Sequence, residues 1–260
     1  MKITLFTSNK IRHEYLISLL SKSCDKLFVI QESKSEITGN KLSEKPKSDL
    51  MINYFENVEI AQKRVFLKSE INLSFKNIKI LKISRGELNS LTLDFLSEYL
   101  QSDCYLVFGS SYIKGELANF LVSKKTINIH AGLSPYYRGT DCNFWALYDN
   151  NPHLVGATIH LLSKGLDNGP ILYHAMPNLK SNNFEYTMSA VKSAVHSVAE
   201  KIKDQSIFKI NATEQDRSKE IRYSKKNEFN DKILRSFMSK KIDLKSNSFD
   251  VSLLKNPYFL

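Results

Sequence analysis

The sequence predicts an α/β protein with a Rossmann-like, mostly parallel β-sheet, helices on both faces of the sheet, and a short C-terminal extension. Two observations predict this fold class. Short apolar runs, which are typical of buried strands, alternate with longer segments whose apolar residues recur at helical spacing. The first apolar run, the helical segment after it and the second apolar run also form a β-α-β opening, which brings its strands together in parallel.

The opening unit starts at the N-terminus of the chain. Residues 2–7 are an apolar run that stops at Ser8 and Asn9, where a helix can begin. A helical pattern then continues to about residue 23. Residues 27–30, with the sequence Leu-Phe-Val-Ile, are expected to be the second strand.

The alternation continues as far as residue 108. Residues 33–47 are polar and contain a Gly and a Pro, which predicts a long loop that is mobile without ligand. Residues 49–68 carry apolar side chains near the helical period and are expected to be a helix. A strand at 78–83, a helix at 89–100 and a strand at 104–108 complete this half.

The second half follows the same pattern. The expected elements are a helix at 114–121, a strand at 126–129, a helix around 144–147, strands at 155–162 and 171–174, and a helix at 183–203. The strand at 104–108 runs into Gly109-Ser110-Ser111, and the strand at 126–129 delivers His130. Because ligands bind beyond the carboxyl ends of parallel strands, we expect these two strand ends to share one crevice.

The composition changes at residue 204, where charged residues, Ser and Asn become dominant and apolar residues become sparse. Such a segment is short for an independent domain. We therefore expect one domain at residues 1–203 and a short extension at residues 204–260 that packs on it.

The chain is basic, with a formal net charge of +10. This charge is compatible with a solvated surface that steers anionic ligands, and also with a dedicated polyanion groove. Lysines are scattered over the whole sequence, which favours the first interpretation.

The cysteines and the N-terminus indicate the compartment. Cys24, Cys104 and Cys142 are odd in number and no pair has CxxC spacing, so neither a disulfide framework nor a zinc site is expected. The N-terminus turns polar too early for a signal peptide, and no stretch approaches the ~20 apolar residues that span a bilayer. We expect a soluble, cytoplasmic protein without a metal.

Three polar residues stand beside predicted strand ends and turns. His130 has the pKa range of a general acid or base, and Asn128, two residues earlier, lies on the same side of the strand. Asp167 lies in the turn Gly165-Leu166-Asp167-Asn168-Gly169 between two strands. Taken singly, His130 could be a hydrogen-bonded structural residue and Asp167 a turn former. Together they can form a proton-transfer site with an amide that donates to an oxyanion.

The residues around this set resemble a known family. The run Asn128-Ile129-His130, then Leu133-Ser134-Pro135-Tyr136-Tyr137-Arg138-Gly139, then Gly165-Leu166-Asp167-Asn168-Gly169-Pro170, is similar to the signature of the folate-dependent formyltransferases. That family includes methionyl-tRNA formyltransferase, glycinamide ribonucleotide formyltransferase and the sugar N-formyltransferases. The resemblance covers residues 108–174 well and the opening β-α-β unit loosely.

The resemblance implies a reaction and a set of site residues. The reaction would be transfer of a formyl group from N10-formyltetrahydrofolate to an amine, with Asn128, His130 and Asp167 as the catalytic residues and no metal. The folate-binding positions would be Phe108, Gly109, Ser110, Arg138, Gly139, Gly165 and Leu166. Arg138 and Gly139 would also shape the loop that flanks the site.

The acceptor amine is expected to belong to a sugar nucleotide. The first strand lacks the Gly-rich phosphate turn of the ribonucleotide enzyme, and the tail after residue 203 is too short for the β-barrel of the methionyl-tRNA enzyme. The short sugar N-formyltransferases, which formylate nucleotide-linked amino deoxysugars for surface polysaccharides such as O-antigen and lipopolysaccharide, fit best. The substrate-binding positions would be Ser8, Asn9, Lys10, Arg12, His13, Tyr136 and Tyr137, with the loop at 33–47 helping to hold the sugar nucleotide.

Alternatives remain open at this point. Lys10, Arg12 and His13 could hold a phosphate at a helix N-terminus or could simply be exposed charges. Trp145 could stack on a sugar or base, or pack in the core. The basic tail raises the alternative of a nucleic-acid-binding protein or a formyltransferase acting on methionyl-tRNA or another small amine, and a non-catalytic folate or sugar binder is a third class. A homodimer could form through a sheet edge or the tail.

Overall fold

The computed structural model describes residues 1–33, 48–67, 70–178, 182–244 and 250–260 of the chain. Its main sheet has eight strands in the order β10-β8-β7-β5-β4-β1-β2-β3, and β6 and β9 form a separate two-stranded ladder. The strands are β1 (Lys2–Ser8), β2 (Lys26–Ser33), β3 (Ile78–Ser84), β4 (Cys104–Phe108), β5 (Ile127–His130), β6 (Tyr137–Gly139), β7 (Ala157–Leu161), β8 (Ile171–Met176), β9 (Arg222–Ser224) and β10 (Tyr258–Phe259). The helices are α1 (Ile11–Ser21), α2 (Asp49–Phe66), α3 (Gly115–Ser123), α4 (Cys142–Tyr148), α5 (Asn183–Lys203) and α6 (Asp231–Met238).

The sheet is mostly parallel, as the sequence predicts. Strands β1 to β5 pair in parallel, whereas β7 runs antiparallel to both β5 and β8. From the central strand β1, the chain first builds outward through β2 and β3 and then returns to β4 and β5 on the other side. The reversal of strand order between β1 and β4 opens a crevice beyond their carboxyl ends, where such folds bind ligands.

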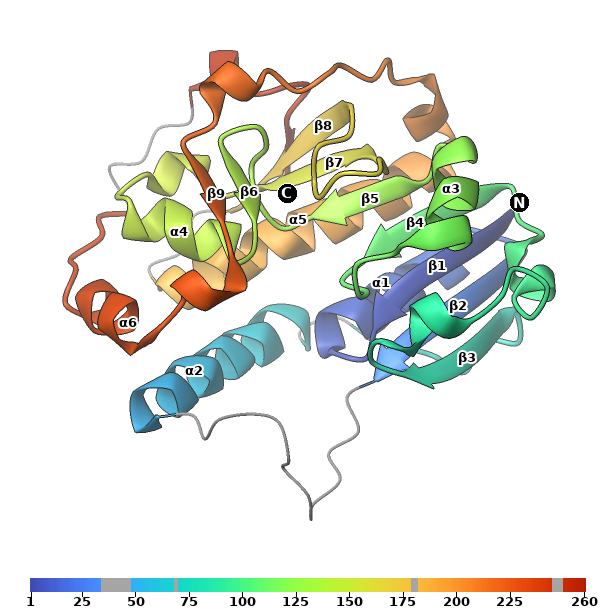
Figure 1. Ribbon diagram of the computed structural model, residues 1–260, viewed down its shortest axis with the longest axis horizontal. Helices are drawn as coiled ribbons and strands as arrows, with labels where there is room; N and C mark the ends of the chain where they lie inside the picture. The colour runs from blue at the N-terminus through green and yellow to red at the C-terminus, as the bar shows by residue number, and fades with distance from the viewer. Residues whose placement is uncertain (34–47, 68–69, 179–181, 245–249) are drawn as a thin grey trace.

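Helices cover both faces of the sheet (Figure 1). Helices α1 and α5 pack on one face, where Leu16, Leu20, Val195 and Val198 belong to the largest apolar cluster. Helix α2 lies against α5 and contributes Phe66 to the same cluster. Helix α3 lies on the opposite face, over a second cluster that the interior side chains of β1 and β4 share.

The expected helix at 89–100 is wrong. The segment forms only two short 3-10 turns, Glu87–Ser90 and Ser97–Leu100. The hydroxyl of Thr92 accepts a hydrogen bond from the backbone N–H of Phe95, and a local bond of this kind competes with a continuous helix. Leu96 is buried but Phe95 is 60% exposed, so the segment has no continuous apolar face.

The residues after 203 pack against the rest of the chain in short pieces. Strand β9 pairs in parallel with β6, and β10 adds to the edge of the main sheet beside β8. Leu234 and Phe237 of α6 are buried in a third apolar cluster with Phe144 and Trp145 of α4. The short strands β6, β9 and β10 were not expected from the sequence. Of the loop expected at 33–47, Ser33 ends β2 and the remainder lies outside the described residues.

No helix within the described ranges is long and apolar enough to cross a bilayer.

Candidate active site

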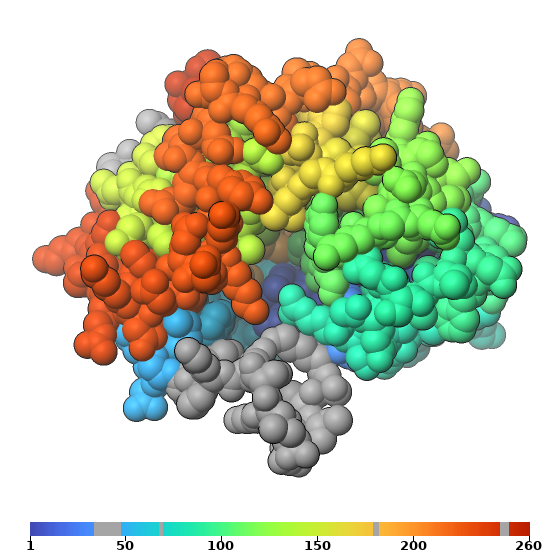
Figure 2. All heavy atoms as spheres, viewed as in Figure 1, coloured from blue at the N-terminus to red at the C-terminus, as the bar shows by residue number. Residues whose placement is uncertain are grey.

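A cavity of about 330 Å³ opens at the carboxyl ends of β4 and β5. The start of α1 and the turn between β7 and β8 also contribute to its wall. Figure 2 shows this region as a hollow between the segments drawn in green and yellow, with blue N-terminal atoms in its depth. The cavity brings together the two strand ends that were expected to share one crevice, and that prediction is confirmed.

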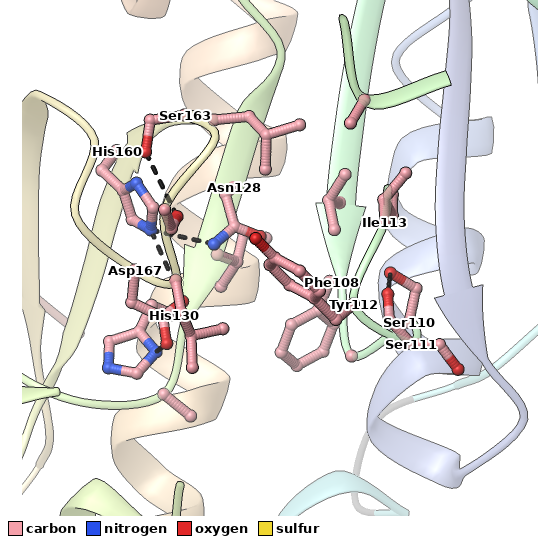
Figure 3. Close-up of a pocket in the computed structure, with 18 of the residues that line it drawn as sticks. Phe108, Ser110, Ser111, Tyr112, Ile113, Asn128, His130, His160, Ser163 and Asp167 are labelled. Atoms are coloured by element: carbon pink, nitrogen blue, oxygen red, sulfur yellow. Dashed lines mark hydrogen bonds and ion pairs between the residues drawn. The ribbon is translucent and has the colours of Figure 1, made fainter. Parts of the chain in front are cut away.

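His130 and Asp167 face each other in this cavity. The Nδ1 atom of His130 lies 3.3 Å from Oδ2 of Asp167, and the side chains are 7% and 12% exposed. Figure 3 shows the two side chains on the same wall of the pocket as Asn128 and His160. At this distance the carboxylate faces the Nδ1 edge of the imidazole and limits how the ring can turn.

Asp167 sits in a turn that few residue types adopt without strain. Its φ is +48°, in the left-handed region, where Asp and Asn are among the tolerated non-glycine residues. The turn also carries Gly165 and Leu166 into the cavity wall. The sequence therefore supplies a residue that can both form this turn and present a carboxylate.

Asn128 is oriented by the buried ring of His160. The Nδ1 atom of His160 lies 2.8 Å from the carbonyl oxygen of Leu161, which can only accept, so Nδ1 carries the proton. Burial lowers the pKa of His160 to about 4, so the ring is neutral and Nε2 is an acceptor. The Nδ2 atom of Asn128 donates to it over 2.8 Å. One amide N–H is thereby fixed, and the second remains for a ligand.

The pairing of β5 with β7 aligns these groups. In the antiparallel register, Asn128 lies opposite His160 and His130 lies opposite Thr158. The hydroxyl of Thr158 donates to the carbonyl of Gly132 over 2.7 Å and accepts from the N–H of Ser134 over 2.8 Å. Strand β7 therefore orients Asn128 and also fixes the loop that follows His130.

The opposite wall is built by the end of β4 against α1. Gly109 has φ +73°, and a Cβ there would lie 2.4 Å from Nε2 of His13. The ring of His13 packs against that of Phe108 with centroids 4.7 Å apart. Burial, together with the charges of Arg12 and Lys10, lowers the pKa of His13 well below its usual value. His13 is thus a neutral packing residue of the cavity wall, not the exposed charge of the alternative interpretation.

A second cavity, of about 250 Å³, adjoins the first. Arg12 and Ala131 line both. Burial lowers the pKa of Arg12, whose guanidinium donates to the side chain of Gln62. The remaining lining is mostly apolar and aromatic: Lys10, Tyr54, Phe55, Val58, Asp141, Asn143, Phe144, Leu147, Asn183, Phe184, Thr187, Met188, Val191 and Phe237. A ligand could extend from one cavity into the other past Ala131.

Comparison with known proteins relates the segment that carries these residues to a known family. The family described as "Formyl transferase" matches residues 103–207. Residues 103–207 are a formyl transferase domain. Asn128, His130, His160 and Asp167 all lie inside it.

Curated relatives resemble this chain at low identity. A methionyl-tRNA formyltransferase of Nostoc sp. is 27% identical over 177 residues, which are 67% of this chain and 47% of the relative. A formyltetrahydrofolate deformylase of Bacillus subtilis is 28% identical over 108 residues, 41% of this chain and 35% of that one. The chain therefore spans less than half the length of these relatives.

Solved structures share the fold. A phosphoribosylglycinamide formyltransferase from Anaplasma phagocytophilum superposes with a TM-score of 0.53 and 18% identity, covering 82% of this chain and 92% of the other. An N-formyltransferase from Helicobacter canadensis, solved with folinic acid and dTDP-3-aminofucose, gives a TM-score of 0.53 and 16% identity over 97% of this chain and 79% of that one.

Most of the positions expected to bind the one-carbon donor lie around the first cavity. Phe108, Gly109, Ser110, Gly139, Gly165 and Leu166 line it, in the formyl transferase domain. Arg138 does not line it. Its buried guanidinium lies behind the turn of Asp167 and donates to the carbonyl of Leu166 over 2.9 Å, because Glu220 holds it there by an ion pair of 2.6 Å.

Of the positions expected to bind the acceptor, the structure places some in a cavity wall and others elsewhere. Lys10 and Arg12 line the second cavity, whereas Ser8 and Asn9 line neither of the two. The expectation that Tyr136 and Tyr137 face a ligand is corrected, because both side chains are buried in the third apolar cluster. Their hydroxyls are held by the carbonyl of Leu253 and by the side chains of Asp149 and Asn151. Trp145 is likewise 1% exposed, as its core alternative requires.

Sequence reasoning missed the roles of Thr158 and His160. The signal was present, because these two polar residues alternate with Ala157 and Ile159 on a strand that is otherwise apolar. It also missed Tyr112, Ile113 and Ser163, which complete the cavity wall of the formyl transferase domain. Among the described residues, no group of three or more His, Cys, Asp or Glu side chains could hold a metal ion.

Proposed function

We propose that this chain is an N-formyltransferase that moves a formyl group from N10-formyltetrahydrofolate to the amino group of a nucleotide-linked amino deoxysugar. The observation that carries the proposal is the convergence of the Asn128 amide, the His130 imidazole and the Asp167 carboxylate in one cavity of a formyl transferase domain. These groups are the ones that acyl transfer between nitrogen atoms needs, namely an oxyanion donor and a proton acceptor.

The reaction would proceed by addition and elimination. The neutral amine of the acceptor attacks the formyl carbon, so that a new C–N bond forms and the carbonyl oxygen becomes an oxyanion. The N–H of Asn128 that is not bonded to His160 donates to this oxyanion, and removal of such a donor typically costs about 10²–10³-fold in rate. The pair of His130 and Asp167 accepts the proton that the attacking amine loses. The bond from carbon to N10 of the folate then breaks, and N10 takes up a proton, giving the formamide and tetrahydrofolate.

The first cavity is the proposed donor site. It is lined by backbone-rich positions at the end of β4 and in the turn before Asp167, including Gly109, Ser110 and Gly165. Peptide N–H and C=O groups at such positions can pair with a planar heterocycle that carries both donors and acceptors. The fold match with a structure that contains folinic acid supports this assignment.

The second cavity is the proposed acceptor site. Its aromatic wall, with Tyr54, Phe144 and Phe184, suits the flat face of a base or the apolar face of a deoxysugar. Lys10 and Arg12 on the same wall would attract phosphate. The shared residue Ala131, next to His130, gives the acceptor amine a path to the formyl carbon. The fold match with a structure containing dTDP-3-aminofucose supports a sugar nucleotide, and a product used in surface polysaccharides is part of the proposal.

The proposal is tested with the purified protein, N10-formyltetrahydrofolate and a panel of nucleotide-linked amino sugars, with formylated product detected by mass spectrometry. At least one sugar should gain a formyl group, and His130→Ala should lose most of the activity. His196→Ala is the matched control, since His196 lies on α5 at 31% exposure, forms an ion pair with Glu200 and lines neither of the two cavities. No product from any sugar, or full activity of His130→Ala, would count against the proposal.

The second candidate function is formylation of methionyl-tRNA. It is favoured by the net charge of +10 and by the 27% identity to the Nostoc methionyl-tRNA formyltransferase. It requires tRNA binding that weakens steeply with salt, because each phosphate contact releases counterions. Equal formylation rates with and without charged tRNA present as competitor, and no tRNA mobility shift at low salt, would leave the sugar nucleotide as the acceptor.

A further inference from the structure

The turn that presents Asp167 is held from behind by residues that lie outside the formyl transferase domain. The Nε2 atom of Gln215 donates to the carbonyl oxygens of Asp167, over 2.9 Å, and of Gly169, over 2.8 Å. The orientation of the amide follows from these partners, because its oxygen would be repelled by two carbonyl oxygens. One side chain thus ties the middle of the turn, at Asp167, to its end, at Gly169.

Arg138 binds the same turn and shares the carbonyl oxygen of Asp167 with Gln215. Its guanidinium donates to the carbonyl of Leu166 over 2.9 Å and to that of Asp167 over 3.3 Å. Its third contact is the carboxylate of Glu220, at 2.6 Å, and the two side chains are 6% and 28% exposed. Arg138 is therefore fixed between the turn and the extension, and Glu220 determines where its planar fork points.

The segment that carries Gln215 and Glu220 is itself anchored on both sides. Thr213 forms a two-way backbone bridge with Ile171 of β8, with hydrogen bonds of 2.7 and 2.9 Å. Strand β9 then pairs with β6, where Gly139 has φ +91° and a Cβ would lie 2.1 Å from the carbonyl oxygen of Ser224. The close backbone approach at Gly139 leaves little room for the segment to shift away from the turn.

These contacts affect the proposed reaction because the turn carries the carboxylate that faces His130. The carboxylate of Asp167 meets His130 at 3.3 Å, and the left-handed backbone of Asp167 gives the turn little stability of its own. A displacement of about 1 Å at a reacting group can cost about 10²-fold in rate. Gln215 and Arg138 together supply three donor atoms to the carbonyl groups of the turn, and we call these two side chains the clamp. The clamp keeps the carboxylate of Asp167 in position against the imidazole of His130.

We propose that Gln215 and Glu220 are positioning residues of the formyl-transfer site, with Gln215 acting directly on the Asp167 turn and Glu220 acting through Arg138. The expected effect on kcat rests on the proposed function. The contacts that hold the turn do not depend on it. It assigns part of the extension after residue 203 to the working site.

The kinetic test compares Gln215→Met, which keeps the length of the side chain but removes the donor, with the neighbouring exposed control Glu214→Gln. Gln215→Met and Glu220→Gln should each lower kcat about tenfold, with little change in the KM of the amine acceptor. In an Asp167→Asn background, Gln215→Met should have little further effect, because the carboxylate that the turn presents to His130 has already been removed. Unchanged kcat in Gln215→Met, or fully additive losses in the double variant, would overturn the inference.

A second measurement needs no turnover. Long-range ¹H–¹⁵N spectra at a fixed pH report the Nδ1 resonance of His130, assigned with His130→Ala. Gln215→Met should move this resonance towards that of Asp167→Asn, whereas Glu214→Gln should leave it in place. If no sugar is formylated but the resonance moves as stated, the clamp stands and the proposed function falls. A resonance that is identical in Gln215→Met and in the unaltered protein, with both folded by circular dichroism, would refute the clamp.

Discussion

The imidazole of His160 accepts a hydrogen bond from the side-chain amide of Asn128 at 2.8 Å, because its other ring nitrogen donates to the carbonyl of Leu161. The Leu161 carbonyl, the His160 ring and the Asn128 amide form a chain of hydrogen bonds in which each donor and acceptor is determined. A carbonyl at one end fixes the tautomer, the tautomer makes Nε2 an acceptor, and the acceptor selects which end of the amide turns toward the ring. The orientation of the proposed oxyanion donor is therefore set by a residue on the neighbouring strand.

Replacing His160 tests this relationship. In His160→Phe, the ring remains but the acceptor is lost, so the amide of Asn128 is free to rotate. We expect kcat for formyl transfer to fall about 10- to 100-fold, somewhat less than for loss of the amide itself, with a smaller change in KM. The control is His196→Phe, on the partly exposed side of α5. A His160→Phe enzyme with the kcat of the unaltered protein would show that Asn128 does not depend on this ring.

The stability of the protein should fall between pH 6.5 and pH 4. Burial lowers the pKa of His160 and of His174 to about 4, whereas the unfolded rings titrate near 6.5. The unfolded state therefore takes up protons that the folded state refuses, and each histidine contributes stability that is present above pH 6.5 and lost as the pH falls to 4. The loss is about 3 kcal/mol for each ring at the acidic end.

Urea denaturation at pH 7 and at pH 4.5 measures this loss, and the comparison with His160→Phe isolates one ring from the carboxylates that titrate in the same range. The free energy of unfolding should depend less on pH in His160→Phe than in the unaltered protein. Equal pH dependence in the two proteins would mean that His160 is not held neutral by burial.

The meeting of Asn128, His130 and Asp167 in one cavity could be predicted because their geometry is short-range or follows from topology. Asn128 and His130 are two residues apart on a strand, so they share a face whatever surrounds them. Their position at a strand end places them in the crevice that a mostly parallel sheet opens. Asp167 was selected through its place in the order of the formyltransferase-like signature, because an Asp in such a turn can by itself be a turn former.

The clamp and the second cavity could not be predicted in the same way. Gln215 meets the Asp167 turn across 48 residues of sequence, and its side chain carries no motif that would single it out. Tyr136 was assigned to the ligand because an aromatic residue in a site loop suits both a core and a stacking surface, and only the packing of α4 and α6 decides between them. The segment at 89–100 failed for a local reason, since the Thr92 hydroxyl competes for backbone groups.

Arg222 should be hard to replace, even by lysine. Its guanidinium forms two hydrogen bonds with Asp149, of 2.9 and 2.7 Å, and lies 4.4 Å from the ring centre of Trp145. Lysine keeps the charge but cannot form the planar fork or stack on the indole. We expect Arg222→Lys to lower the free energy of unfolding by about 1–2 kcal/mol in urea denaturation. The exposed Arg235→Lys on α6 should cost much less, and equal costs for the two variants would contradict the role given to the fork.

A side chain at Gly109 should be destabilising for two reasons, the positive φ of the backbone and the contact with His13. Gly115, which has only the positive φ, allows the two effects to be measured separately. Gly109 and Gly115 both have positive φ, at +73° and +64°, but a Cβ would meet His13 at 2.4 Å in the first and nothing within 4 Å in the second. Gly115→Ala therefore reports backbone strain alone, about 1–2 kcal/mol, and Gly109→Ala should cost more. Adding His13→Ala should remove part of the extra cost, because the ring that the methyl group meets is gone. If Gly109→Ala is no more destabilising than Gly115→Ala in urea denaturation, the packing of His13 against the end of β4 does not constrain this position.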